Sequence, residues 1–306
     1  MAFSTYRVAG LTILILCLSV MCLSGFCQSG TSTKLEQLRQ QVNQELAKQQ
    51  GTFAVAFKDL ETGQELLIRE HEVFHAASTM KTPVMIEVYK QAAQKQLSLS
   101  DSLTIKTEFK SIVDGSPYTL DAKTDSDTNI YKYIGTKRTL ADLVYDMIIV
   151  SSNLATNLVI ERVDPKKVTQ TMRDLGAKDI QVRRGVEDSK AFSQGLNNTT
   201  TAYDLMVIFE KIATGQAVSS EASNDMIRIL LDQRFNTKIP AKLPKDVKVA
   251  HKTGSITGVL HDSGIVFLPD GRKYVLVLLS KDLKNEPAAE NALATVSALI
   301  YNYIKG

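Results

Sequence analysis

The chain has 306 residues, 44% of them hydrophobic and 23% charged, which is enough to bury a sizeable core. Its 36 basic and 33 acidic residues leave a formal net charge of +3, without a block of basic residues. This near balance argues against nucleic acid as a partner, and the length allows one large domain or two interleaved lobes.

The first 29 residues differ in composition from the rest of the chain. Arg7 is their only charged residue, an almost continuous apolar run covers residues 8–26, and a polar Gln-Ser-Gly stretch follows. This order is typical of a secretory signal peptide, with cleavage after Cys27 or Ser29. We therefore predict a signal peptide at 1–29 and an exported, periplasmic or secreted protein. An uncleaved membrane anchor is the alternative, since about 20 apolar residues span a bilayer.

All three cysteines, Cys17, Cys22 and Cys27, lie in this segment. The mature domain would therefore contain neither a thiol nor a disulfide. Lipid modification of Cys27 is a further alternative, because Leu-Ser-Gly lies just upstream. However, Phe26 directly precedes the cysteine, where lipidation signals require a small residue, so ordinary cleavage is favoured.

The secondary-structure signals begin with a Gln-rich helix at 31–50 and an alternating strand at 52–57, which a Thr-Gly turn connects to a strand at 65–68. The middle of the chain is helical. Apolar residues at 140–148 keep the i, i+3, i+4 spacing of a buried helix face. Further helices are expected from Asp164 to Gly176 and from Thr201 to Gly215, both with capping signals.

Strand patterns return near the C-terminus. Val247 and Val249 alternate with polar residues, and strands at 264–268 and 274–279 flank a Pro-Asp-Gly turn before a helix at about 288–303. We therefore predict an α/β (α+β) fold, an antiparallel sheet flanked by helices with an inserted, mostly helical lobe. The sheet lobe would comprise about 30–75 and 240–306, the helical lobe about 76–239, and a cleft between them would suit a site.

Ser78 and Lys81 form the only Ser-x-x-Lys in the sequence, at the start of a helical stretch. This spacing places both side chains on one helix face. A serine hydroxyl needs a neighbouring base to act as a nucleophile, and a lysine of lowered pKa can serve. The helix N-terminus would also favour developing negative charge. The alternative is a serine that only caps the helix.

Two further polar groups of residues follow. Ser151-Ser152-Asn153 comes after the helix at 140–148, and Lys252-Thr253-Gly254-Ser255 ends the strand at 247. Each alone describes a polar turn or a strand end. Together with Ser78 and Lys81, they fall in the order of the Ser-x-x-Lys, Ser-Asp-Asn and Lys-Thr-Gly set of penicillin-recognising enzymes.

From about residue 35 to 305 the chain resembles the class A β-lactamases and the wider β-lactamase-like serine hydrolases. The resemblance includes the text Met-Ile-Ile-Val-Ser-Ser-Asn-Leu-Ala-Thr-Asn at 147–157. It implies that Ser78 is the acylating nucleophile and Lys81 its proton acceptor. Ser151 would relay a proton to the leaving nitrogen.

The resemblance also implies a substrate-binding set. Asn153 would hold a substrate amide, and Lys252, followed by Thr253 and Gly254, would bind near the substrate carboxylate. The backbone N–H groups of Ser78 and Ser255 would form an oxyanion hole, in which one donor is worth about 3 kcal/mol.

The sequence departs from the family in two places. Ser152 replaces the aspartate of Ser-Asp-Asn. In the loop before Thr199, the family has a glutamate two residues after an arginine and an asparagine four residues further on. Here Glu187 lies three residues after Arg184, and Ala191 follows four later. Asn198 stands where the family's aspartate pairs with the arginine. Glu187 is therefore the hypothetical deacylating base, against the alternative of an ordinary surface carboxylate.

Two patterns suggest metal sites. His71-Glu-Val-Phe-His75 matches the zinc-protease pattern, but lies in an irregular run without a clear third ligand. Asp125–Asn129 begins like a calcium loop, but lacks the glycine at position six and the glutamate at position twelve. We expect no metal and no cofactor, and interpret 114–129 as a surface insertion. His251 and His261 are interpreted as strand-end residues.

The sequence thus predicts a serine hydrolase that opens β-lactam amides through an acyl-serine, a β-lactamase associated with antibiotic resistance. Two alternatives stay open: a cell-wall peptidase acting on D-alanyl peptides, and a sensor or trap that stays acylated. In each case the partner is a small β-lactam or D-alanyl peptide. We expect a monomer without stable membrane insertion once the signal is removed.

Overall fold

The computed structural model describes residues 1–2 and 21–306, with side chains from residue 33 onward in the main body. The predicted signal peptide at 1–29 thus falls mostly on residues outside the described part. Among the described residues, no helix has both the length and the apolar character needed to cross a membrane.

The elements alternate as the sequence predicts, with long strands near both ends and helices between them. In chain order they are α1 (Met21–Leu46), β1 (Thr52–Asp59), β2 (Glu65–Ile68), β3 (Phe74–His75), η1 (Ala77–Met80), α2 (Lys81–Ala93), β4 (Ser102–Thr104), β5 (Glu108–Lys110), β6 (Pro117–Thr119), η2 (Ile130–Tyr133), β7 (Lys137–Thr139), α3 (Leu140–Ile149), α4 (Asn153–Val163), α5 (Pro165–Asp174), α6 (Ser189–Ser193), β8 (Thr199–Thr200), α7 (Ala202–Ala213), α8 (Ser220–Leu231), β9 (Lys248–Ile256), β10 (Val259–Phe267), β11 (Lys273–Lys281) and α9 (Glu286–Lys305).

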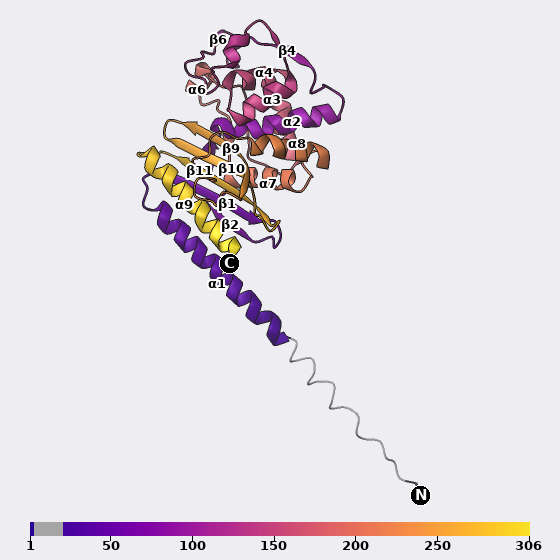
Figure 1. The fold of residues 1–306 in the computed structure, drawn as a ribbon, viewed down its shortest axis with the longest axis vertical. Coiled ribbons are helices and arrows are strands. Elements are labelled where there is room, and N and C mark those ends of the chain that lie inside the picture. Colours follow the sequence, from indigo (N-terminus) through magenta and orange to yellow (C-terminus); the bar gives the residue numbers. More distant parts are fainter. Residues whose placement is uncertain (3–20) are drawn as a thin grey trace.

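The main sheet joins the two ends of the chain. Its order is β2-β1-β11-β10-β9, and every neighbouring pair is antiparallel. Val55 of β1 lies opposite Leu278 of β11. The predicted fold, an antiparallel sheet with helices and an inserted helical lobe, is confirmed (Figure 1). Because β9 is an edge strand, one row of its backbone groups is free of sheet pairing.

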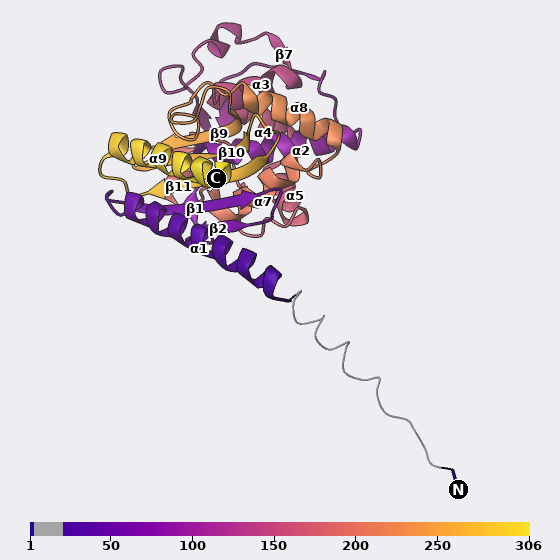
Figure 2. The ribbon, with the colours of Figure 1, turned by 60° about the horizontal axis from the view of Figure 1, so that its bottom comes forward.

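Helices α1 and α9 lie side by side over the outer face of the sheet (Figure 2). They bury an apolar layer with β1 and β11, in which Phe57, Leu276, Leu293 and Ile300 are fully buried. Burial of this kind contributes about 25 cal/mol per Å² of apolar surface. The first helix begins earlier than the sequence predicts, at Met21, and ends at Leu46.

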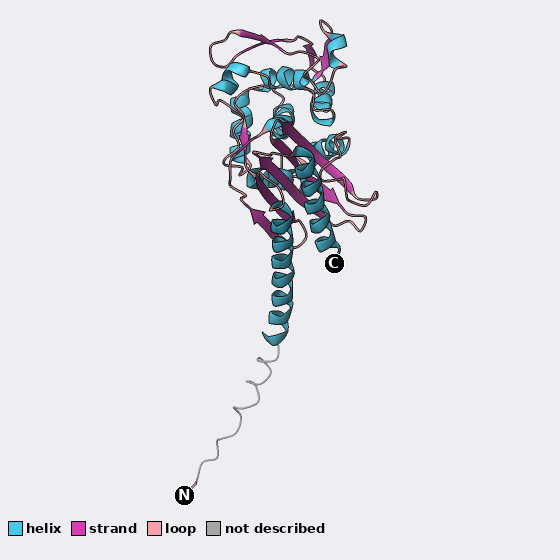
Figure 3. Ribbon diagram, turned by 90° about the vertical axis from the view of Figure 1, so that its left-hand side faces the viewer, coloured by secondary structure: helices cyan, strands magenta, loops and turns pink. Residues whose placement is uncertain are grey.

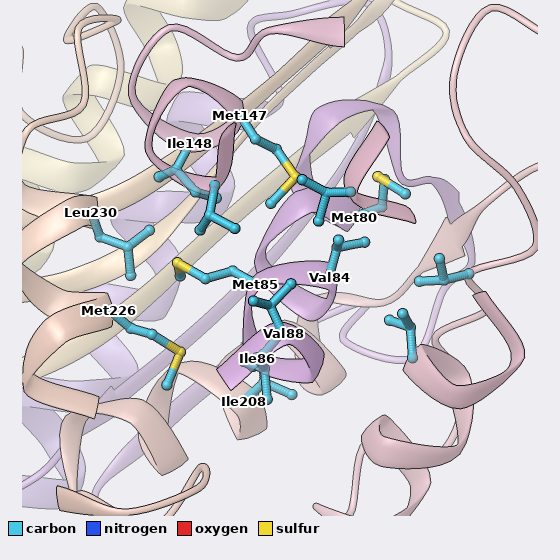
Figure 4. Close-up of a cluster of buried hydrophobic side chains, with 14 of the residues drawn as sticks. Met80, Val84, Met85, Ile86, Val88, Met147, Ile148, Ile208, Met226 and Leu230 are labelled. Carbon is cyan, nitrogen blue, oxygen red and sulfur yellow. The ribbon is translucent and has the colours of Figure 1, made fainter. Parts of the chain in front are cut away.

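The inner face of the sheet packs against α7, and α8 packs against β9. Above them α2 forms the centre of the helical lobe. Figure 4 shows Met85 and Val88 of α2 among side chains of α3 and α8, including Met147 and Met226. Because α2 is buried on nearly all sides from Lys81 to Tyr89, its N-terminus has a fixed position.

A long arm connects α2 to α3 and carries four short strands and η2, seen at the top of Figure 3. The pairs are β4 with β7 and β5 with β6. The interpretation of 114–129 as a surface insertion holds only in part. Asp125 and Asp127 are each only 8% exposed, because this part of the arm packs against the start of α4.

Candidate active site

A cleft of about 750 Å³ opens where η1 and β9 face the arm and the loop between α5 and β8. Its lining brings together residues distant in sequence, among them Ser78, Ser126, Ser151, Asn153, Glu187, Thr253 and Ser255. The site residues predicted from the sequence thus surround one cavity, with Lys81 and Lys252 buried beneath it. Gly254 lies beside them on β9.

Ser78 lies at a sharp bend immediately before α2. The preceding residue, Ala77, has φ of 45°, a left-handed conformation that is unfavourable for a residue with a side chain. The bend is fixed because the Ala77 N–H donates to His75 Nδ1 at 3.0 Å and the Thr79 hydroxyl to the Ala76 carbonyl at 2.6 Å. Within residues 33–306 no hydrogen bond holds the Ser78 hydroxyl, which is half-buried at the cleft.

Strand β9 passes very close to this bend. A Cβ at Gly254 would lie 3.2 Å from the backbone nitrogen of Ser78 and 3.1 Å from Thr79 Cγ2. A side chain at this position would have to push η1 away by a few tenths of an ångström, so glycine suits this close approach. The edge strand therefore runs directly along the serine, where a bound substrate could use its unpaired backbone groups.

Lys81 is fully buried one helical turn from Ser78. Its Nζ donates to the Ser151 carbonyl at 2.7 Å, Ser151 Oγ at 3.1 Å and Asn153 Oδ1 at 2.9 Å. Burial lowers the pKa of Lys81 to about 7, against the opposing charges of Asp125 and Glu187. A large fraction of the amine is therefore neutral at physiological pH and can accept a proton.

Ser151 joins two lysines. Its Oγ accepts from Lys81 and, at 3.0 Å, from Lys252 Nζ, which also donates to the Thr253 carbonyl at 2.8 Å. Burial and the nearby Lys81 lower the pKa of Lys252. With two donors on its oxygen, the Ser151 hydroxyl keeps its own proton free to donate into the cleft.

Asn153 connects this cluster to Glu187. Asn153 Nδ2 donates to Glu187 Oε1 at 3.3 Å, and the exposed Glu187 has a left-handed φ of 63°. The loop is fastened at the preceding residue, where Asn157 accepts from Val186 N at 2.6 Å and donates to its carbonyl at 3.0 Å. A Cβ at Gly185 would lie 2.3 Å from Asn157 Oδ1, so any side chain there would displace Asn157 from its bonds to Val186.

The loop closes without the ion pair of the related family. Asn198 Oδ1 accepts from Arg183 N at 2.8 Å and Arg184 N at 3.2 Å, and its Nδ2 donates to the Arg184 carbonyl at 2.9 Å. The buried Arg184 guanidinium donates to the Leu196 carbonyl and to Asn197 Oδ1, both at 2.9 Å. An asparagine thus closes the loop through backbone bonds. The substitution is visible in the sequence, but this arrangement is visible only in the structure.

Asp188, next to Glu187, is buried, and its carboxylate is fully hydrogen-bonded. Its carboxylate accepts from Ser111 Oγ at 2.9 Å, from Ile112 N at 3.0 Å and from Ala191 N at 3.1 Å. These bonds cap α6 and tie the loop to the β5–β6 hairpin. Both residues line the cleft, but Glu187 is the exposed member of this pair, whereas the carboxylate of Asp188 is held by these three bonds.

The histidines of the zinc-like pattern have separate partners. The His71 ring packs on Tyr203 with centroids 4.8 Å apart, whereas His75 receives the Ala77 N–H. In the described part of the chain, no three His, Cys, Asp or Glu side chains gather closely enough to hold a metal ion. His251 and His261 are buried within β9 and β10, so their interpretation as strand-end residues is wrong.

The chain is also similar in sequence and fold to known proteins. A model of a β-lactamase enzyme family matches residues 37–304. This chain belongs to the β-lactamase enzyme family. β-Lactamase ROB-1 of Haemophilus influenzae is 26% identical over 254 residues, which cover 81% of this chain and 78% of ROB-1.

Solved structures share the fold of this β-lactamase family member. PBP-A is 27% identical with a TM-score of 0.75, covering 88% of this chain and 96% of PBP-A; a point mutant of PBP-A was solved as an acyl-enzyme complex with penicillin G. A β-lactamase from Sphaerobacter thermophilus is 25% identical with a TM-score of 0.73, covering 86% of this chain and 95% of that one.

Proposed function

We propose that this chain is an exported serine β-lactamase of the class A type, which opens β-lactam amides through an acyl-enzyme on Ser78. One observation carries the proposal. The Ser151 hydroxyl lies between two buried lysines, Lys81 and Lys252, in the same cleft as a serine whose own hydroxyl is available for attack. This arrangement supplies a nucleophile, a proton acceptor and a proton donor together.

Acylation begins when neutral Lys81 accepts the Ser78 proton. Ser78 Oγ attacks the lactam carbonyl, and the N–H groups of Ser78 and Ser255 stabilise the oxyanion. The C–N bond then breaks, and Ser151 donates its proton to the departing nitrogen. The ammonium of Lys81 or Lys252 returns a proton to Ser151. Atoms and charge balance without a metal or a cofactor, and none is proposed.

Substrate binding uses Asn153 and the edge strand. Asn153 would hold the substrate amide, and Lys252 with Thr253 would hold the substrate carboxylate beside Gly254. A carboxylate next to Lys252 would favour the charged ammonium, which burial otherwise opposes. The binding of an anionic substrate would thereby favour a protonated Lys252, whose positive charge balances the substrate carboxylate.

Deacylation requires a base that directs water at the ester. We propose Glu187, because its carboxylate lines the cleft and lies 3.3 Å from Asn153 Nδ2. A substrate amide that binds Asn153 would release Glu187 from this bond. The carboxylate would then be free to align a water molecule.

A second candidate is a domain that is acylated without fast turnover, or a D-alanyl peptidase. It is favoured by the irregular position of Glu187, since Asn157 fastens the loop at Val186 and not at Glu187. The similarity to PBP-A, of which a mutant formed an acyl-enzyme with penicillin G, supports the same candidate.

For the organisation of the chain, we propose a signal peptide at 1–29 and one hydrolase domain at 30–306. Its sheet lobe would comprise about 30–75 and 240–306, and its helical lobe 76–239. The single charge and long apolar run of the first 29 residues support export to the periplasm or the medium. We further propose a monomer that confers antibiotic resistance.

The test is the reaction of the purified protein with a chromogenic cephalosporin, following both burst and steady state. Steady hydrolysis that is lost in Ser78→Ala supports the β-lactamase. A stoichiometric burst without turnover supports the trap. No reaction, together with release of D-alanine from a D-alanyl peptide, supports the peptidase. An adduct that persists in Ser78→Ala would overturn the assignment of the nucleophile.

A further inference from the structure

The segment from Ser151 to Asn153 needs support from elsewhere in the chain. Ser151 has φ of 55°, a left-handed conformation that is unfavourable with a side chain. Asn153 begins α4, so the first N–H groups of this helix have no partner within the helix. Yet the proposed mechanism depends on this segment, because it supplies three acceptors to Lys81.

Asp125, in the arm between α2 and α3, satisfies the start of α4. Its Oδ1 accepts from Asn153 N and its Oδ2 from Leu154 N, both at 2.9 Å. The carboxylate is itself fixed by the Tyr131 hydroxyl at 3.0 Å and by Asp127 N at 3.1 Å. Both oxygens are therefore engaged, and a negative charge at a helix N-terminus is favourable.

Ser126, the next residue, holds the other side of the turn. Its Oγ donates to the Val150 carbonyl at 2.7 Å and to the Ser151 carbonyl at 2.9 Å. The same Ser151 carbonyl accepts from Lys81 Nζ. Asp125 and Ser126 together therefore hold the turn by hydrogen bonds on both sides of Ser151: to the carbonyl groups of Val150 and Ser151, and to the N–H groups of Asn153 and Leu154.

The segment lacks a carboxylate of its own. Ser152 stands where the family motif has aspartate, and its hydroxyl only accepts from Ala155 N at 3.3 Å. We infer that Asp125 and Ser126 are positioning residues that hold Ser151 and Asn153 against Lys81, and that Asp125 also supplies the negative charge that faces Lys81. This inference rests on the proposed function.

The charge of Asp125 has a consequence that packing alone would not have. Three titratable groups surround Lys81: Asp125 from the arm, Glu187 from the loop before α6 and Lys252 from β9. Both carboxylates raise the pKa of Lys81, whereas burial lowers it. Neutralising Asp125 therefore lowers the pKa of Lys81 and moves the acidic limb of the acylation profile to lower pH.

The experiment compares three variants with the parent. Asp125→Asn removes the charge and turns a donor toward one α4 N–H. Ser126→Ala removes the grip on the Val150 and Ser151 carbonyls without changing charge. Asp127→Asn is the matched control: Asp127 is equally buried in the same arm, but its Oδ1 only accepts from Asn129 and Ile130 N–H groups, which an amide oxygen can also do. Acylation by penicillin G is followed by mass spectrometry from pH 5 to 9, with melting temperatures.

We expect the plateau acylation rate to fall about 10- to 100-fold in Asp125→Asn and Ser126→Ala, because the reacting groups are displaced. The acidic limb moves to lower pH in Asp125→Asn only, and Asp127→Asn behaves like the parent. Parent-like plateaus and limbs in the first two variants would overturn the inference, as would an equal loss in Asp127→Asn. If Asp125→Asn does not fold, the plateau of Ser126→Ala decides. A parent that penicillin never acylates would refute the proposed function, and this inference with it.

Discussion

Ser151 receives hydrogen bonds from two lysines that differ in what they can do for a reaction. Lys81 lies at the start of α2 beside the nucleophile, and Lys252 lies on β9, where a substrate would bind. Burial and the nearby Lys81 lower the pKa of Lys252, whereas burial alone lowers that of Lys81. The two residues should therefore respond differently to pH and to the charge of the substrate.

The pH dependence of acylation tests Lys81. Its pKa lies at about 7, and only the neutral amine accepts a proton. The acylation rate should therefore rise about tenfold per pH unit below 7 and level off above it. Stopped-flow or quenched mass spectrometry from pH 5 to 9 measures this limb. A profile that is flat down to pH 5 would show that another group takes the proton.

The charge of the substrate tests Lys252. Lys252→Ala removes the ammonium beside Ser151, so kcat/KM for substrates with a carboxylate should fall at least tenfold more than for neutral analogues. Urea denaturation of the same variant checks stability. Equal losses for the two kinds of substrate would contradict a role in binding the carboxylate.

The role of Glu187 as the deacylating base can be tested by measuring turnover of the Glu187→Gln variant. In Glu187→Gln the side chain keeps its shape and can still meet Asn153, but it cannot deprotonate water. Acylation should persist, whereas deacylation should slow by about 10²- to 10⁴-fold, so that a stoichiometric burst accumulates. Asp188→Asn serves as a comparison. It should lower stability and not turnover, because the Asp188 carboxylate accepts hydrogen bonds from Ser111 and from the start of α6. Parent-like turnover in Glu187→Gln would make this carboxylate a bystander.

Among the elements, β9 and β10 each contain a glycine that allows a close backbone approach, but to different neighbours. Gly254 lets β9 approach Ser78, whereas Gly264 lets β10 approach β9. A Cβ at Gly264 would lie 2.5 Å from the Ala250 carbonyl oxygen and from His251 Cβ, both of which belong to the neighbouring strand. The contact at Gly254 affects the position of the nucleophile, whereas the contact at Gly264 affects the packing of the sheet.

Alanine at each position should separate the two tasks. Gly264→Ala forces the strands apart and should lower the free energy of unfolding by about 1–3 kcal/mol or more. Gly254→Ala meets contacts of 3.1–3.2 Å at η1, and should reduce acylation more than stability. Urea denaturation and burst amplitudes on both variants provide the comparison. The reverse order of effects would show that β9 does not position the site.

The order of the motifs and the periodicity of the elements made much of the fold and the central site residues predictable. Ser78 and Lys81 are close in sequence, so helix geometry sufficed, and Lys252 marked the end of a recognisable strand. Asp125, Ser126 and Asn157 could not be found as supports, because in each pair one partner lies in an irregular loop: Asp125 and Ser126 in the arm, and Val186, the partner of Asn157, in the loop before α6. No periodicity connects Asp125 with Asn153, or Asn157 with Val186. Left-handed residues such as Ser151 and Glu187 carry no sequence signal of their own.

At the scale of the whole molecule, the sheet order makes the site depend on both ends of the chain. β1 pairs with β11, and β9, which carries Lys252, is synthesised after the entire helical lobe. His261 of β10 connects the late strands to the segment before the nucleophile. Its Nε2 lies 2.9 Å from the carbonyl oxygen of His75, three residues before Ser78. Burial lowers the pKa of His261 to about 4, so this ring stays neutral and bonded across the physiological range.

All residues up to β11 must therefore leave the ribosome before this sheet can close. Until β9, β10 and β11 emerge, Ser78 has no edge strand beside it and Ser151 has only one of its lysines. Pairings between such distant segments form slowly. A nascent chain that lacks these three strands would thus have no complete cleft. The topology that builds the cleft therefore also delays its completion until the last strands of the sheet have been synthesised.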